Sequence, residues 1–118
     1  MGTIKSFREL EIWKKGIELV KGIYKMTAGF PKSELYGLTS QMRRCAVSIP
    51  SNVAEGFRRR HPKEFKHFLN IALGSSAELE TQLVIAKELG YLEGEREAYF
   101  IEVIDHIDRM IVSLWKKL

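Results

Sequence analysis

The sequence lacks the features that mark several large protein classes. It has a single cysteine, Cys45, among 118 residues, so a disulfide framework is excluded and a reducing cytoplasm is the expected location. No apolar run is long enough to span a membrane, and residues 1–15 lack the apolar segment of a secretory signal. The alternating pattern of a strand is also missing. We expect one cytoplasmic domain, residues 1–118, with no membrane segment.

The motifs of several enzyme classes are absent too. There is neither a glycine-rich phosphate loop nor a catalytic-serine elbow. Glu64 and His67 have the spacing of a metal site in a helix bundle, but a second pair and further carboxylates are missing, since Glu102 and His106 are four residues apart. Cys45 is in phase with apolar neighbours, which favours a core residue over a nucleophile. We expect no enzyme activity, no metal and no cofactor.

What the sequence does contain is helical periodicity, in four segments at about 6–28, 35–59, 62–89 and 95–117. Ser6 and Glu9 form a capping box, and Gly29, Pro62 and Gly90 mark the breaks. Pro50 lies inside the second segment, where the apolar phase continues, so a kink is expected there. The predicted fold class is all-α, an up-down-up-down antiparallel four-helix bundle.

The first and fourth helices have more apolar surface than a four-helix core can cover. The first helix has two apolar rows, Leu10, Trp13, Ile17, Val20 and Tyr24 on one and Ile12, Leu19, Ile23 and Met26 on the other. The apolar rows of the two helices include Ile12, Leu19, Val103 and Met110, and we expect that a four-helix core cannot cover them all. Exposed apolar patches of this kind mark interfaces, so the chain is expected to form a homo-oligomer.

Two polar stripes run along the second and third helices. Their members are Gln41, Arg44, Ser48, Asn52, Glu55 and Arg59 on the second helix, and His67, Asn70, Gly74, Glu78 and Gln82 on the third. In a tight antiparallel hairpin, facing residues have numbers that sum to about 122 to 123.

This register predicts a structural polar seam between the two helices. It pairs Arg44 with Glu78, Ser48 with Gly74 and Ser75, Asn52 with Asn70, Glu55 with His67, and Gln41 with Gln82. Ser, Asn and Gly in mid-helix sacrifice helix propensity, which indicates a specific contact. The alternative interpretation is that both stripes are solvated helix faces.

Positive charge is concentrated in the first half of the chain. Residues 1–61 carry twelve Lys/Arg and five Asp/Glu, whereas residues 62–118 carry seven and ten, which together give the net charge of +4. The candidate nucleic-acid contacts are Arg43, Arg58, Arg59, Arg60, Lys63 and Lys66. The alternative interpretation, for a monomer, is that these cations lie at a solvated helix end, where the helix dipole stabilises positive charge. In a ring of subunits the cluster would repeat and suit phosphate backbones.

The segments FPKSELYGLTSQMRRCAVSIPSNVAEGFRR and KEFKHFLNIALGSSAELETQL resemble the four-helix-bundle family encoded within 23S ribosomal RNA intervening sequences. The resemblance extends from Phe7 to Tyr91. It implies a pentamer similar to the accessory protein of diversity-generating retroelements, which is a basic barrel associated with nucleic acid and a reverse transcriptase.

Together, these observations predict a non-catalytic, oligomeric accessory protein that binds RNA or DNA through a basic surface with weak sequence specificity. A protein partner such as a reverse transcriptase is implied by the resemblance alone. The alternative function is a protein-protein interaction scaffold with no nucleic-acid role, in which the basic residues meet an acidic partner or a neighbouring subunit.

Overall fold

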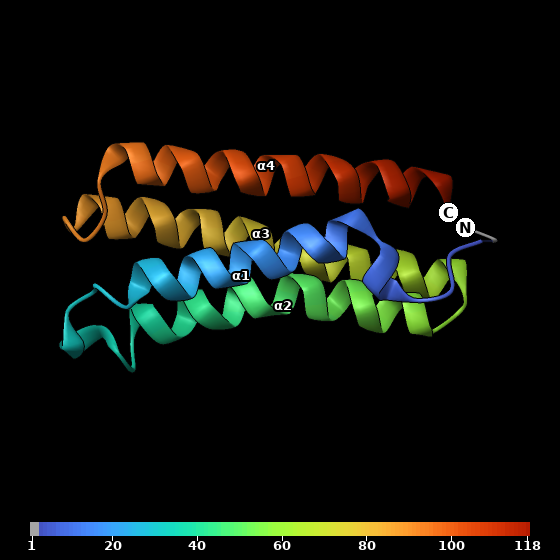
Figure 1. The fold of residues 1–118 in the computed structure, drawn as a ribbon, viewed down its shortest axis with the longest axis horizontal. Coiled ribbons are helices and arrows are strands. Elements are labelled where there is room, and N and C mark those ends of the chain that lie inside the picture. Colours follow the sequence, from blue (N-terminus) through green and yellow to red (C-terminus); the bar gives the residue numbers. More distant parts are fainter. Residues whose placement is uncertain (1–2) are drawn as a thin grey trace.

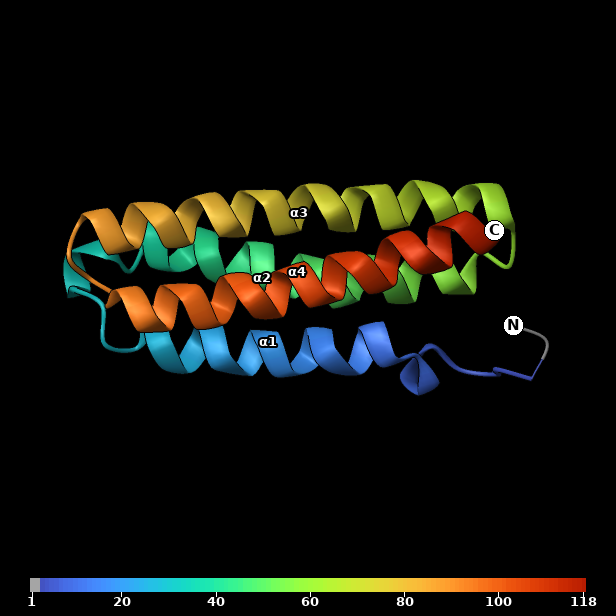
Figure 2. The same cartoon turned by 90° about the horizontal axis from the view of Figure 1, so that it is seen from above.

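A computed structural model describes residues 3–118. Its elements, in chain order, are η1 (Phe7–Glu9), α1 (Glu11–Thr27), η2 (Lys32–Glu34), α2 (Leu38–Arg58), α3 (Pro62–Glu88) and α4 (Gly94–Lys117), where η is a 3-10 turn. Residues 3–118 contain no strand. The four α-helices lie side by side in an elongated bundle of 46 × 24 × 20 Å, and successive helices run in opposite directions (Figure 1, Figure 2). The prediction of an all-α four-helix bundle is confirmed.

The sequence predicts that the first helix begins at the capping box. In the structure the capping box belongs to η1, a separate turn that precedes α1. Ser6 Oγ accepts a hydrogen bond from the Arg8 N–H at 3.2 Å, and the Glu9 carboxylate accepts one from the Ser6 N–H at 3.0 Å. Leu10 then adopts an extended conformation with φ −73° and ψ 129°, and its side chain is buried. Because this residue leaves the helical path, α1 begins at Glu11.

The second helix also begins later than expected, at Leu38. The residues before it form η2, and the Glu34 side chain caps α2 by accepting a hydrogen bond from the Leu38 N–H at 3.2 Å. The other Glu34 oxygen accepts a hydrogen bond from the Tyr91 hydroxyl at 3.0 Å, which ties the loop before α2 to the loop before α4.

Pro50 lies inside α2, and the helix continues through it to Arg58. Its ring is buried against α1, where a Cβ added at Gly16 would stand 3.0 Å from Pro50 Cβ. The missing methyl group at Gly16 thus makes room for the ring. The kink expected at Pro50 stays a prediction.

The core runs the length of the bundle. Its fully buried side chains include Leu19, Ile23, Met42, Ile49, Val53, Leu69, Leu79, Leu83, Ile104, Ile107 and Ile111. They recur every three or four residues on each helix, as the sequence pattern predicts.

Of the two apolar rows on α1, the one that holds Leu19 is buried. On the other row Trp13, Ile17 and Val20 are half-buried and Tyr24 is exposed. This second row is therefore the one left partly uncovered, whereas Ile12 and Leu19 are covered by the core. Ile12 and Leu19 lie on the same side of α1 as Gly16. This side faces the core because Gly16, which has no side chain, lets α1 approach Pro50 of α2 closely.

One carboxylate is placed between α3 and α4. Asp108 accepts a hydrogen bond from the Ser76 hydroxyl at 2.6 Å and is half-buried. Burial raises the pKa of Asp108, the Ser76 hydrogen bond opposes this, and the nearby carboxylates of Asp105 and Glu80 raise the pKa further.

The pKa of Asp108 predicts a pH dependence of stability. Because its pKa is higher in the folded state, the folded chain keeps this proton to a higher pH than the unfolded chain does, and stability falls as pH rises between the two values. Asp108→Asn should therefore gain stability relative to wild type as the pH is raised from about 3 to about 7. Urea denaturation across this range measures the difference. Glu102→Gln on the exposed side of α4 is the control, and an equal trend in both variants would contradict the assignment.

Two helical glycines provide a second test, of the packing between α2 and α3. A Cβ at Gly56 would stand 2.8 Å from Phe68 Cβ and 2.9 Å from Phe65 Cδ1, whereas a Cβ at Gly74 would meet nothing within 4 Å. Gly56→Ala should destabilise the fold by about 1–3 kcal/mol through overpacking. Gly74→Ala should stabilise it by about 0.5–1 kcal/mol, because alanine suits a helix better. Chemical denaturation measures both, and equal effects would rule out the close approach at Gly56.

Candidate nucleic-acid interface

The turn between α2 and α3 carries the arginine cluster that the sequence singled out. Arg60 has a left-handed backbone conformation, with φ 56°, and its N–H donates to the Phe57 carbonyl at 3.3 Å. His61 is extended, and Pro62 opens α3, where its missing N–H costs no helical hydrogen bond. The turn is short, so Arg58, Arg59 and Arg60 are all exposed at one end of the bundle.

Three of the cations at this end lie over aromatic rings. The distances to the ring centroids are 5.3 Å from Arg58 to Phe7, 5.0 Å from Arg59 to Phe68 and 4.6 Å from Lys66 to Trp115. At exposed sites such contacts stabilise by about 0.5–1 kcal/mol, while the charged groups keep part of their hydration. The rings therefore restrain these cations without neutralising them.

The fold adds basic residues from both ends of the described chain. Residues near the N-terminus pack through Phe7 against Arg58, and α4 finishes beside the α2–α3 turn (Figure 1). We call the resulting surface the basic end: Lys5, Arg8, Arg58, Arg59, Arg60, Lys63, Lys66, Lys116 and Lys117. Its acidic neighbours are Glu9, Glu11, Glu55 and Glu64. Nine cations against four acids leave a clear excess of positive charge.

Arg43 is the one predicted nucleic-acid contact that does not belong to the basic end. Its Nε donates to Thr27 Oγ1 at 2.9 Å, a second guanidinium nitrogen donates to the Tyr24 carbonyl at 3.4 Å, and the group lies 4.6 Å from the Tyr24 ring centroid. Arg43 therefore caps the C-terminal end of α1, where a cation also suits the helix dipole.

The register of the polar seam is confirmed at its centre. Ser48 Oγ and Ser75 Oγ are hydrogen-bonded at 2.8 Å across α2 and α3. Asn52 supports this pair from within α2, since its Nδ2 donates to Ser48 Oγ at 2.9 Å and to the Ser48 carbonyl at 2.8 Å. Asn52 is thus engaged by its own helix, and no hydrogen bond joins it to Asn70 within residues 3–118.

Next to this pair the seam opens into a hollow of about 410 Å³, which we call the polar hollow. It is lined by Gln41, Arg44, Cys45, Ser48, Ser75, Glu78 and Gln82. The predicted partners Gln41 and Gln82 therefore line the same site, as do Arg44 and Glu78. The ion pairs of the described chain all lie within single helices, so Arg44 and Glu78 share the hollow without an ion pair between them. Both are exposed, and the large stability cost of a buried pair does not apply to them.

Nearer the basic end, the seam differs from the prediction. Glu55 forms an ion pair with Arg59 at 3.1 Å, one turn along the same helix, instead of contacting His67. Glu55 pairs with Arg59 because residues four apart in sequence are neighbours on a helix surface. His67 and Asn70 are exposed and line a second hollow, of about 530 Å³, together with Arg59, Lys63 and Lys66.

Cys45 belongs to the polar seam as well as to the edge of the core. Its sulfur lies 3.8 Å from Glu78 Oε2, to which the thiol can donate. The same sulfur accepts a hydrogen bond from Gln82 Nε2 at 3.5 Å. Burial raises the pKa of the Cys45 thiol, the Gln82 hydrogen bond lowers it, and the charge of Glu78 raises it. The thiol therefore stays protonated at neutral pH, which argues against a nucleophile. Its apolar phase alone did not reveal these polar partners.

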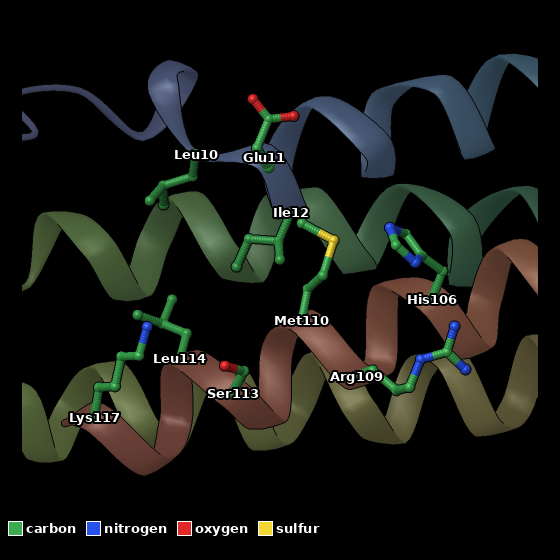
Figure 3. A pocket seen from close by; sticks show the side chains of 9 residues that line it. All are labelled: Leu10, Glu11, Ile12, His106, Arg109, Met110, Ser113, Leu114 and Lys117. Carbon is green, nitrogen blue, oxygen red and sulfur yellow. The ribbon is translucent and has the colours of Figure 1, made fainter.

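A groove between α1 and α4 ends close to the basic end. Its volume is about 380 Å³, and Ile12 and Met110 point toward one another across it (Figure 3). Arg109 and Lys117 lie along its α4 side. Met110 lines this groove, whereas Val103 lines another hollow further along α4. Both are half-buried, so part of the apolar row on α4 reaches the surface.

Comparison with known proteins identifies the family. Residues 8–113 match the model of the 23S rRNA-intervening sequence protein family. The chain belongs to this family.

A solved structure supports the same fold. The crystal structure of a protein of unknown function from the S23 ribosomal protein family of Bacteroides thetaiotaomicron superposes with a TM-score of 0.79. It is 23% identical in sequence and covers 89% of this chain and 95% of its own. Comparison with curated proteins finds no match.

Other features of this intervening-sequence family member bear on its chemistry. Across residues 3–118, no three His, Cys, Asp or Glu side chains converge as metal ligands. Glu64 and His67 line the hollow at the start of α3, whereas Glu102 and His106 line a site on α4 with Arg109. No helix in the described chain is both long enough and apolar enough to cross a membrane.

Proposed function

We propose that this chain is a non-catalytic accessory protein that binds the phosphate backbone of RNA or DNA with the basic end of its bundle. The observation that carries the proposal is that four stretches of the chain, residues 5–11, 55–60, 62–66 and 116–117, lie at one end of the bundle (Figure 1) and together hold nine Lys/Arg and four Glu. A concentrated positive surface of this kind attracts a polyanion and releases its counterions.

The chemistry of the basic end favours backbone contacts over base contacts. Phe7, Phe68 and Trp115 each lie under a cation, so these rings are not free to stack with bases. Phe57 and Phe65 pack edge-to-face with each other, with ring centroids 6.1 Å apart. Sequence specificity should therefore be weak.

Assembly would strengthen this binding. A homo-oligomer repeats the basic end by symmetry and multiplies the phosphate contacts available to one strand. The resemblance to the family favours a pentamer. Exposed apolar side chains that such contacts could cover include Tyr99, Ile71 and Val112.

A protein-interaction scaffold is the second candidate, and one observation favours it. Leu35, Tyr36 and Leu89 are exposed, with Tyr36 at 94% of its full surface. They lie in or beside the loops at the end of the bundle opposite the basic end, close in sequence to Glu34 and Glu88. Apolar side chains surrounded by charge are typical of protein contacts.

The proposal predicts a steep salt dependence that depends on the turn arginines. Each phosphate neutralised contributes about 0.9 to the log–log slope on duplex DNA and about 0.7 on single strands. Changing Arg58, Arg59 and Arg60 together to Ala should therefore reduce the slope by roughly 2 to 3 units per chain. The three side chains are exposed, so the fold should persist. Fluorescence anisotropy with a labelled RNA and a labelled DNA, titrated at several salt concentrations, measures the slopes.

Changing Lys21, Lys25 and Lys32 together to Ala is the matched control. It removes the same charge from exposed positions outside the basic end. The proposal requires this variant to retain most of the wild-type slope. Equal slopes for the two triple variants, or no binding by wild type at low salt, would reject the nucleic-acid function and favour the scaffold.

A further inference from the structure

The polar hollow between α2 and α3 contains a buried carbonyl oxygen without a partner. Gln82 is only 8% exposed, and its Oε1 has no hydrogen bond within the described chain. Buried side-chain acceptors are almost always paired in folded proteins, because an unpaired acceptor loses its bonds to water without replacement. Gln82 also lines the polar hollow, so a donor group that enters the hollow is a candidate partner for this oxygen.

The neighbours of Gln82 fix which of its two polar atoms lacks a partner. The Cys45 sulfur lies 3.8 Å from Glu78 Oε2, and a carboxylate can only accept, so we assign the thiol proton to this contact and the sulfur as an acceptor toward Gln82. The amide nitrogen of Gln82 meets this need at 3.5 Å. The carbonyl oxygen is therefore the atom left over, and the site calls for an N–H or O–H group.

The charges that line the hollow are of both signs. Arg44 lies on α2 and Glu78 on α3, and neither takes part in the ion pairs of residues 3–118. Glu78 and Gln82 are one turn apart on α3, so two acceptors flank one side of the hollow. The other side offers the guanidinium donors of Arg44 and the amide of Gln41.

We propose that the polar hollow binds a small zwitterion that carries a primary ammonium and a carboxylate, as a free α-amino acid does. The ammonium has three donors, which suit the Glu78 carboxylate and Gln82 Oε1. The carboxylate suits Arg44, whose planar group binds carboxylates in a bidentate way. This site is separate from the basic end and does not rest on nucleic-acid binding.

Other ligand classes fit the hollow less well. None of its seven lining residues is aromatic, so a nucleobase would find no ring to stack on. Cys45 and Glu78 are its only thiol and carboxylate, and they are too few for a typical transition-metal site. A singly charged amine or carboxylate would leave either Arg44 or Glu78 unpaired.

The test is nuclear magnetic resonance of the isotope-labelled full chain, titrated with glycine, L-alanine, L-serine and L-glutamate. Propylamine, propionate and guanosine monophosphate are the comparison compounds. We expect saturable shifts at the Gln82 side-chain amide and at the backbone amides of Cys45, Ser48 and Glu78. The zwitterions should bind at least tenfold more tightly than propylamine or propionate, because only they satisfy both charged residues.

Variants then connect the shifts to the proposed contacts. Arg44→Gln and Glu78→Gln should each weaken binding by roughly 10–100-fold, the usual effect of losing a charge-assisted hydrogen bond. Both residues are exposed, so the fold should tolerate the changes. Arg96→Gln and Glu88→Gln make the same charge changes at exposed positions elsewhere and should leave the affinity unchanged.

Three results would overturn the proposal. The first is the absence of saturable shifts up to about 10 mM ligand, which would mean that water alone satisfies Gln82. The second is binding of guanosine monophosphate in preference to the amino acids. The third is an equal loss of affinity in the hollow variants and in their controls.

Discussion

Helices α2 and α3 approach so closely that a methyl group at Gly56 would stand 2.8 Å from Phe68 Cβ. Toward the middle of the same seam, the hydroxyls of Ser48 and Ser75 are joined by a hydrogen bond of 2.8 Å. Together with the short turn at Arg60 and His61, these contacts set one register for the hairpin. Both candidate surfaces depend on it: the turn places the arginines at one end, and the register lines up the polar groups of the hollow.

The two surfaces are distinct in position and chemistry. The Arg58–Arg60 cluster lies roughly 20 Å along α2 from Cys45, at the rise of a regular helix. The basic end is exposed, charged and restrained by aromatic rings, which suits a mobile polyanion at modest specificity. The polar hollow combines opposite charges with a buried unpaired acceptor, which suits a small ligand of defined donor pattern. One chain could therefore respond to two different molecules.

Sequence reasoning predicted the hairpin well because it needed only two facts, an equal rise per residue and a turn at Pro62. It placed Ser48 opposite Ser75 and brought Gln41, Arg44, Glu78 and Gln82 to one site. The predicted contacts were wrong where a side chain has more than one partner within reach. Glu55 pairs with Arg59 on its own helix, and Arg43 donates a hydrogen bond to Thr27 of α1. Periodicity could not decide which row of α1 is buried, since both rows are apolar. Lys5, Arg8, Lys116 and Lys117 could have been added to the basic cluster, because an up-down bundle of four helices returns both termini to the α2–α3 turn.

The register of α2 against α3 is the central claim, and disulfide trapping tests it most directly. In a Cys45→Ala background, Ser48→Cys with Ser75→Cys places two thiols where the hydroxyls now lie 2.8 Å apart. Disulfides form only when the two Cβ atoms are about 3.5–4.5 Å apart. We predict rapid and nearly complete cross-linking within the monomer under mild oxidation, and little in a control pair of Ser51→Cys with Ser75→Cys, since Ser51 lies on the exposed side of α2. Slow cross-linking of the first pair, or equal cross-linking of both pairs, would contradict the account.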